Sequence, residues 1–237
     1  MTPSRSGGIT ALLAAVMVAA CATPVAAQTS TSASSANAPG EQAAIAKARA
    51  DSARYPYTKA DIDFMTGMIG HHSQAIVMSR WAPTHGASSS IQLLASRIIN
   101  AQQDEIATMQ QWLRDRQQPV PDGQYHAGMD MKMDMGSSDM KMDGSDHQAL
   151  MPGMLTDAQM KQLDAARGAD FDRLFLTFMI QHHRGAVAMV KQLFDTYGAG
   201  QDETVFKFAT DANVDQTTEI ARMQRMLVAQ MFGTGDQ

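Results

Sequence analysis

Apolar residues recur at helical spacing along four long segments of the chain. In the first segment, Ile62, Met65 and Ile69 follow the three- and four-residue steps of one helix face. Thr58, with Asp61 three residues later, has the pattern of a capping box at the start of that segment. No β-type alternation interrupts these patterns, so we predict an all-α protein. The expected long helices cover about 59–81, 88–117, 170–197 and 202–232, with shorter helices at 41–54 and 156–167.

The first pair of long helices is repeated in the second pair. The pattern M-I-x-H-H-x-x-A-x-x-M begins at Met68 and again at Met179. The pattern Q-x-x-E-I-x-x-M-x-x-x-L begins at Gln102 and again at Gln216, on the helix that follows each His-His pair. A whole helical hairpin is therefore duplicated. We expect a ferritin-like four-helix bundle over 57–232, with the connector 118–153 between the hairpins.

The two His-His pairs are the main candidates for chemistry. Neighbouring helical residues point about 100° apart, so the two histidines of one pair cannot face the same spot. Each half then offers one imidazole with a thioether about one turn away, and this combination suits soft Cu(I). A methionine stripe is also common core filler, and a buried histidine is often structural; the duplication favours ligation. The candidate ligands are Met65, Met68, His71, His72 and Met78 in the first half and Met179, His182, His183 and Met189 in the second.

Two glutamates lie on the partner helices of the His-His pairs. Glu105 and Glu219 occupy the same position of the repeated Q-x-x-E pattern. They are candidates for orienting the imidazoles from outside the metal shell. They could equally be polar residues on a solvated face.

The connector between the hairpins is rich in methionine, aspartate and glycine, and it has no helical or strand period. We therefore expect it to be disordered without a ligand. Several thioethers on such a chain could wrap around Cu(I), whereas its histidines and aspartates could hold Cu(II). A biased spacer without ligands is the alternative. The candidate ligands here are His126, Met129, Met131, Met133, Met135, Met140, Met142 and His147.

Composition narrows the function further. The chain has 20 methionines, 7 histidines and one cysteine, so it forms neither an internal disulfide nor a thiolate metal site. The formal net charge is −5, and lysine and arginine form no basic block. We therefore expect no nucleic-acid partner.

The N-terminal residues have the pattern of an export signal. Arg5 precedes a short apolar run, and small residues before Gln28 offer a cleavage site after Ala27. A competing interpretation is a lipoprotein signal that ends at residue 20, with Cys21 lipidated; membrane attachment is expected only in that case. The segment 28–56 is interpreted as a flexible tether. The expected location is the periplasm or the outer cell surface.

The M-I-x-H-H-x-x-A-x-x-M helix and its Q-x-x-E-I-x-x-M partner, present twice, resemble the CopM-like family of exported ferritin-like proteins. This resemblance covers about residues 57–232 and implies periplasmic copper binding and copper resistance through Met and His ligands. Leu176 replaces the counterpart of Met65, so the halves are not equivalent.

Together these features predict a copper-binding protein, with Cu(I) as its main ion and Ag(I) or Cu(II) as alternatives. We expect it to sequester or chaperone the metal without turnover, and to meet other periplasmic copper-handling proteins. One alternative is a helical scaffold or stress protein without metal. Another is a di-metal oxidase, which needs Glu-x-x-His on facing helices; the glutamates here begin Glu-x-x-Thr and Glu-x-x-Arg instead.

Overall fold

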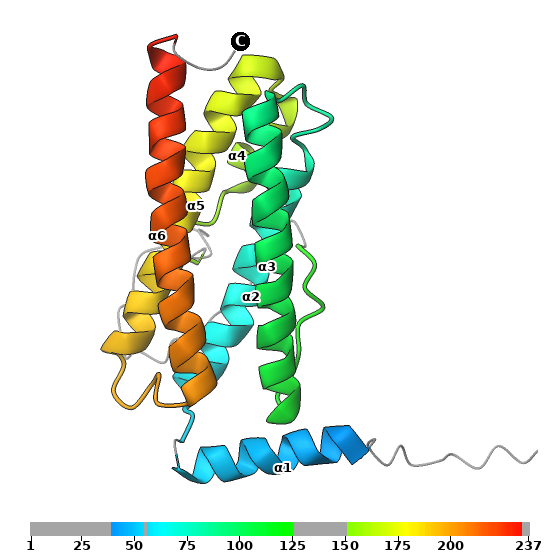
Figure 1. The fold of residues 1–237 in the computed structure, drawn as a ribbon, viewed down its shortest axis with the longest axis vertical. Helices are drawn as coiled ribbons and strands as arrows, with labels where there is room; N and C mark the ends of the chain where they lie inside the picture. Colours follow the sequence, from blue (N-terminus) through cyan, green and yellow to red (C-terminus); the bar gives the residue numbers. More distant parts are fainter. Residues whose placement is uncertain (1–38, 55, 126–150, 234–237) are drawn as a thin grey trace, which may run out of the picture. The chain divides into compact units, whose positions relative to one another are not determined.

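The computed structural model describes residues 39–54, 56–125 and 151–233. Every regular element in these ranges is a helix, as predicted (Figure 1). The predicted export signal, Cys21 and the connector ligands from His126 to His147 lie outside the described residues. The helices are α1 (Pro39–Arg54), α2 (Lys59–Arg80), α3 (Ser89–Asp115), α4 (Asp157–Ala165), α5 (Gly168–Asp195) and α6 (Glu203–Met231).

The helix ends follow from local capping chemistry. Thr58 accepts a hydrogen bond from the backbone of Asp61, and the Asp61 carboxylate accepts one from the backbone of Thr58 at 2.6 Å. This confirms the predicted capping box at α2. Thr156 and Gln159 form the same arrangement at α4. Because such caps satisfy the first backbone amides of a helix, the predicted and observed helix bounds differ by no more than two residues.

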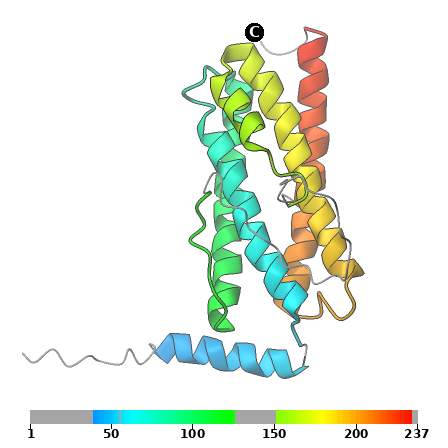
Figure 2. The same ribbon diagram turned by 180° about the vertical axis from the view of Figure 1, so that it is seen from behind.

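The bundle consists of two hairpins that pack through their first helices. Helix α2 packs against α3, α5 packs against α6, and α2 and α5 meet in antiparallel orientation between them (Figures 1 and 2). The two His-His helices are thus the central pair, with α3 and α6 on their outer sides. The predicted bundle of duplicated hairpins is confirmed.

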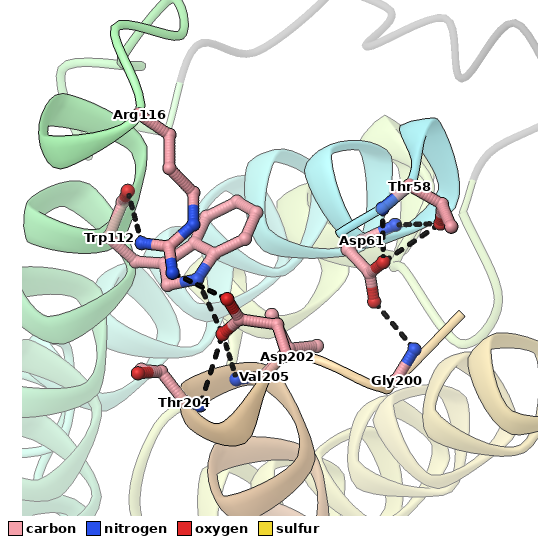
Figure 3. Close-up of polar contacts among 8 residues, drawn as sticks. All are labelled: Thr58, Asp61, Trp112, Arg116, Gly200, Asp202, Thr204 and Val205. Atoms are coloured by element: carbon pink, nitrogen blue, oxygen red, sulfur yellow. Dashed lines mark hydrogen bonds and ion pairs between the residues drawn. The ribbon is translucent and has the colours of Figure 1, made fainter. Parts of the chain in front are cut away.

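Each central helix is joined by an aspartate to the connecting loop of the other hairpin. Asp61, in the first turn of α2, accepts a hydrogen bond from the Gly200 backbone at 2.7 Å (Figure 3). Asp172, at the equivalent position of α5, accepts one from the Ser88 backbone at 3.2 Å. This reciprocal pairing fixes both ends of α2 against α5, and therefore sets the level at which their histidines meet.

A third aspartate, Asp202, stabilises the lower end of the bundle. Asp202 caps α6 and also accepts a hydrogen bond from the Trp112 indole at 3.0 Å (Figure 3). Its other oxygen pairs with Arg116, whose guanidinium lies over the Trp112 ring. A buried carboxylate with this many donors holds α3 and α6 together at their ends.

Both described ends of the connector pack against the bundle. Val120 and Tyr125 pack against the bundle on one side, and Met151 is buried on the other. The segment predicted as a tether also contains α1. Within the described ranges, no helix combines the length and apolar character needed to cross a membrane.

Candidate metal centre

The four histidines of the two His-His pairs come together at the middle of the bundle. All four side chains are fully buried. His71 of α2 and His182 of α5 lie against each other, with ring centroids 3.8 Å apart and planes inclined by 40°. Their neighbours His72 and His183 turn away from this contact, as the 100° step between adjacent helical residues requires.

Each outer histidine is bonded to a glutamate of its own hairpin. His72 Nε2 lies 2.7 Å from a Glu105 carboxylate oxygen, and His183 Nε2 lies 2.6 Å from Glu219. The glutamates are only partly exposed, at 20% and 25%. Since a carboxylate accepts, Nε2 carries the proton in both imidazoles.

His71 is oriented by the backbone of the connector. Its Nε2 lies 3.0 Å from the Pro152 carbonyl oxygen. A carbonyl oxygen has no proton to give, so His71 also carries its proton on Nε2. In all three of these imidazoles, Nδ1 is the nitrogen that has no hydrogen-bond partner among the described residues.

Five ring nitrogens of this cluster have no hydrogen-bond partner among the described residues, and we call them the open nitrogens. They are Nδ1 of His71, His72, His182 and His183, and Nε2 of His182. The His182 ring also lies near the His71 backbone carbonyl, a contact that falls short of hydrogen-bond geometry and opposes the lowering of its pKa. Buried polar atoms are nearly always paired in folded proteins, so a group of five needs an explanation. Metal-binding histidines typically donate their second ring N–H to a carboxylate or a backbone carbonyl, as three of these histidines do.

The central pair is held in the neutral form that binds metals. The pKa of His71 is lowered to about 3, mainly by burial and next by the neighbouring His72, whereas the hydrogen bond to Pro152 opposes the shift. Burial also lowers the pKa of His182 well below 6.5, with His71 as the next contribution. Both rings are therefore uncharged at neutral pH and keep a lone pair for an ion.

The last residues of the connector and the two residues after them contact both central helices. A Cβ atom added at Gly185 would lie 1.9 Å from the Pro152 carbonyl oxygen, so only glycine fits there. On the facing helix, the Gln74 side chain donates to the Leu155 carbonyl at 3.0 Å and accepts from its amide at 2.8 Å. We call Pro152–Leu155 the docked segment. It brings the Pro152 carbonyl to His71.

The predicted methionine ligands of α2 and α5 are all buried, but they lie at two distances from the histidines along these helices. Met68 and Met179 are within one turn of a histidine on their own helices. The other three, Met65, Met78 and Met189, are six or seven residues away, which is about 10 Å along the axis. An ion among the imidazoles would therefore meet Met68 and Met179 first.

Imidazoles and carboxylates do not complete a metal shell by themselves. In the ranges 39–54, 56–125 and 151–233, no three His, Cys, Asp or Glu side chains converge at a distance that would hold an ion. The Met68 and Met179 thioethers are further donors within one turn of the histidines. Such a mixed set of neutral nitrogen and sulfur donors fits a soft ion and does not fit a hard divalent ion.

Sequence reasoning did not identify the residues that position the histidines from the connector side. No role was assigned to Gln74, Pro152 or Gly185. A signal was present in the repeat, because the position that is Gln74 in the first half is a glycine, Gly185, in the second. The buried Gln102 and Gln216 were seen as part of the repeated pattern but were not assigned a role. Their burial is a finding of the structure.

The fold and the buried histidine centre define a class of helical proteins built from two duplicated hairpins. The family model described as a domain of unknown function, DUF305, matches residues 61–227, and the chain belongs to this family. A 62-residue stretch is 44% identical to an uncharacterized protein of Acanthamoeba polyphaga mimivirus; it covers 25% of this chain and 41% of that relative.

Solved structures share the fold over most of the chain. A DUF305 protein from Streptomyces coelicolor, described as secreted, is 28% identical, with 72% of this chain and 93% of that chain covered and a TM-score of 0.57. A DUF305 fragment from Deinococcus radiodurans is 25% identical, with 72% and 97% covered and a TM-score of 0.56. CopM in its Cu(II)-bound form is 26% identical, with 70% and 95% covered and a TM-score of 0.51.

Proposed function

We propose that this protein is an exported copper-binding protein that sequesters or chaperones Cu(I) without turnover, and so contributes to copper resistance. Ag(I) and Cu(II) are the other ions that it would accept. The observation that carries the proposal is the group of open nitrogens. Fully buried imidazoles with Nε2–H anchored and Nδ1 free are poised as ligands.

The thioethers of the bundle complete the proposed shell. Met68 and Met179 lie one turn from the histidines and are fully buried. Thioethers remain unprotonated at any pH and are soft donors, so they favour Cu(I) and Ag(I) over zinc or iron. Met65, Met78 and Met189, farther along α2 and α5, would bind an ion after it leaves the histidine centre.

The comparisons support both the metal and the location. CopM, a protein of similar fold, has been solved with Cu(II) bound. The relative from Streptomyces coelicolor is described as secreted. An exported protein with these ligands would meet copper outside the cytoplasm, in the periplasm for a cell with two membranes, and would hand it to other copper-handling proteins there.

The geometry favours binding over di-metal oxidase chemistry. A di-iron site draws several carboxylates toward two ions, with Glu-x-x-His on facing helices. Here each glutamate bonds a histidine of the neighbouring helix and is partly exposed. Both carboxylates thus accept hydrogen bonds from imidazoles, as expected of groups that orient the metal ligands from outside the metal shell.

The test is competition for Cu(I) against a chelator of known affinity, with the full exported chain. We expect binding at least as tight as sub-micromolar, and a large loss when His71, His72, His182 and His183 are replaced by glutamine. His85→Gln is the matched control. His85 is also buried, but it bonds Asp164 and lies outside the cluster.

Two outcomes would contradict the proposal. One is Cu(I) affinity that is unchanged in the four-histidine variant, which would place the metal elsewhere. The other is equal loss in His85→Gln, which would show that the variants act through the fold. Deleting residues 126–150 should lower the number of ions bound while the tightest equivalents remain.

A further inference from the structure

Two methionines outside the His-His helices, Met109 and Met223, lie about one helical turn from the level of the histidine centre. The bond between His72 and Glu105 fixes the antiparallel register of α2 and α3. Four residues along each helix from that bond, Met68 and Met109 therefore lie at the same level, one turn from the histidines. Both are fully buried and belong to the same apolar cluster.

The second hairpin repeats this arrangement on the opposite side of the histidines. The bond between His183 and Glu219 fixes the register of α5 and α6. Met179 and Met223 then lie at one level, and both are fully buried in the other apolar cluster. Helices α2 and α5 run antiparallel (Figure 1). One methionine pair therefore lies on each side of the histidine layer.

A buried glutamine from the other hairpin lies at the level of each methionine pair. Gln216 is three residues before Glu219 on α6, so the bond between Glu219 and His183 places it level with Ala186 on α5. The contact between His71 and His182 in turn places Ala186 level with Met68 on α2. By the same construction, Gln102 is level with Ala75 and Met179. Ala186 shares a cluster with Met68 and Met109, and Ala75 shares one with Met179 and Met223, as this register requires.

These glutamines carry polar atoms that find no hydrogen-bond partner within the described chain. They are both amide atoms of Gln102 and the oxygen of Gln216, in side chains only 2% and 3% exposed. An apolar core does not retain such groups without a partner. Two equivalent positions, each with two sulfurs and a buried amide, therefore point to a bound species on each side of the histidines.

We propose that Met109 and Met223 are metal ligands, and that the bundle holds two equivalent soft-metal sites. One site joins the Met68 and Met109 sulfurs to the histidine layer, and the other joins Met179 and Met223 to it. This inference rests on the proposed function and adds to it the number of tight sites and two ligands on α3 and α6. The sites take Cu(I) or Ag(I), because neutral thioethers and imidazoles suit a soft monovalent ion.

The test follows each methionine in the full chain while Ag⁺ is added. Methyl-¹³C methionine gives one NMR signal for each methionine, and Met→Leu variants assign them by the loss of one signal. We expect Met68, Met109, Met179 and Met223 to shift together within the first two equivalents. The histidine ring signals should shift in the same steps.

A second measurement tests the same ligands by affinity. Met109→Leu and Met223→Leu conserve side-chain volume and should fold. Each should weaken Cu(I) binding at one of the two tight equivalents by at least about tenfold, the loss that follows removal of even a supporting group. Met226→Leu, on the same helix as Met223 and half-buried, is the matched control and should bind as the parent protein does.

The outcomes separate this inference from the proposed function. Shifts of the histidine, Met68 and Met179 signals with no change at Met109 or Met223 would overturn the inference and leave the function standing. One tight equivalent in place of two would also overturn it. No response from any histidine or bundle methionine would overturn both.

Discussion

The two hairpins share one chemistry but differ where the connector returns to the bundle. In both, the outer histidine bonds a glutamate at 2.6–2.7 Å, and an aspartate at the start of the central helix holds the loop of the other hairpin. Position 74 on α2 is glutamine and its repeat partner on α5 is Gly185. Both contact the single docked segment.

This difference has a geometric reason. The two duplicated hairpins are related by an approximate two-fold axis. The docked segment lies close to that axis but is present once, so it cannot make the same contacts with both hairpins. One helix must therefore yield space and the other must supply hydrogen bonds. His71 gains the Pro152 carbonyl as a result, while both ring nitrogens of His182 remain open. The four histidines of the two halves are thus equivalent in sequence, but the docked segment gives His71 and His182 different hydrogen-bond partners.

The largest effect is expected from filling the space at Gly185. In Gly185→Ala, the new methyl group would collide with the Pro152 backbone, which cannot move aside as a side chain can. We expect a loss of about 3 kcal/mol in the free energy of unfolding, because overpacking against backbone is poorly relieved. Urea denaturation measures it, with Ala186→Gly as a control that opens space on the same helix. An unchanged midpoint in Gly185→Ala would show that the docked segment does not lie there.

Acid should destabilise the metal-free protein through its central histidines. The pKa of His71 is about 3 when folded and near 6.5 when unfolded, so the unfolded chain takes up a proton first as pH falls. The contribution of His71 to the free energy of unfolding is full above pH 6.5 and declines as the pH falls toward 3. We expect a loss of about 2 kcal/mol between pH 6.5 and 5 from His71 alone, at about 1.4 kcal/mol per pH unit.

Denaturation of the parent protein and of His71→Gln and His182→Gln at several pH values would check this. The burial of His182 also lowers its pKa, so either replacement should flatten the dependence. The same slope in both variants and in the parent would contradict the assignment to these histidines.

The glutamates test whether the two halves support their ligands equally. Glu105→Ala and Glu219→Ala each remove the acceptor of an Nε2–H group. Each should weaken Cu(I) binding by about 10–100-fold, since the imidazole loses its orientation and some basicity. Chelator competition measures this, and exposed Glu203→Ala is the control. A large effect in one half with none in the other would show that the halves bind differently.

The smallest effects concern the loop contacts at the bundle ends. Asp61 accepts from Gly200 and from two groups of Thr58, whereas Asp172 accepts from Ser88 alone among the residues described. Asp61→Asn should therefore cost about 2 kcal/mol of stability and Asp172→Asn about 1 kcal/mol. Thermal denaturation ranks the two variants. The reverse order would show that the Ser88 contact holds the hairpins more strongly.

Much of this architecture could be predicted from the order of residues. Apolar spacing and caps such as Thr58–Asp61 are local features, so the helices and the duplicated hairpins were predicted correctly. The faces of His71 and His72 also follow from helical geometry. Periodicity shows which residues share a face of one helix; it does not show which face of another helix they meet.

The residues that sequence reasoning missed depend on contacts between distant segments. The meeting of His71 with His182 is set by loop contacts from Asp61 and Asp172. Gly185 has meaning only once Pro152 lies against it, and a helical glycine by itself predicts weaker helix formation. Met109 resembles any core methionine until the bond between Glu105 and His72 fixes the level at which it lies.

The most direct test of the account observes the histidine nitrogens while Ag⁺ binds. With ¹⁵N-labelled histidine, the metal-free protein should show Nε2–H tautomers for His71, His72 and His183. Ag⁺ at the first equivalents should then shift the Nδ1 signals of the central cluster and leave the Nε2 protons in place. Saturation of the protein with Ag⁺ while every ring nitrogen of the four histidines keeps its metal-free signal would contradict the account.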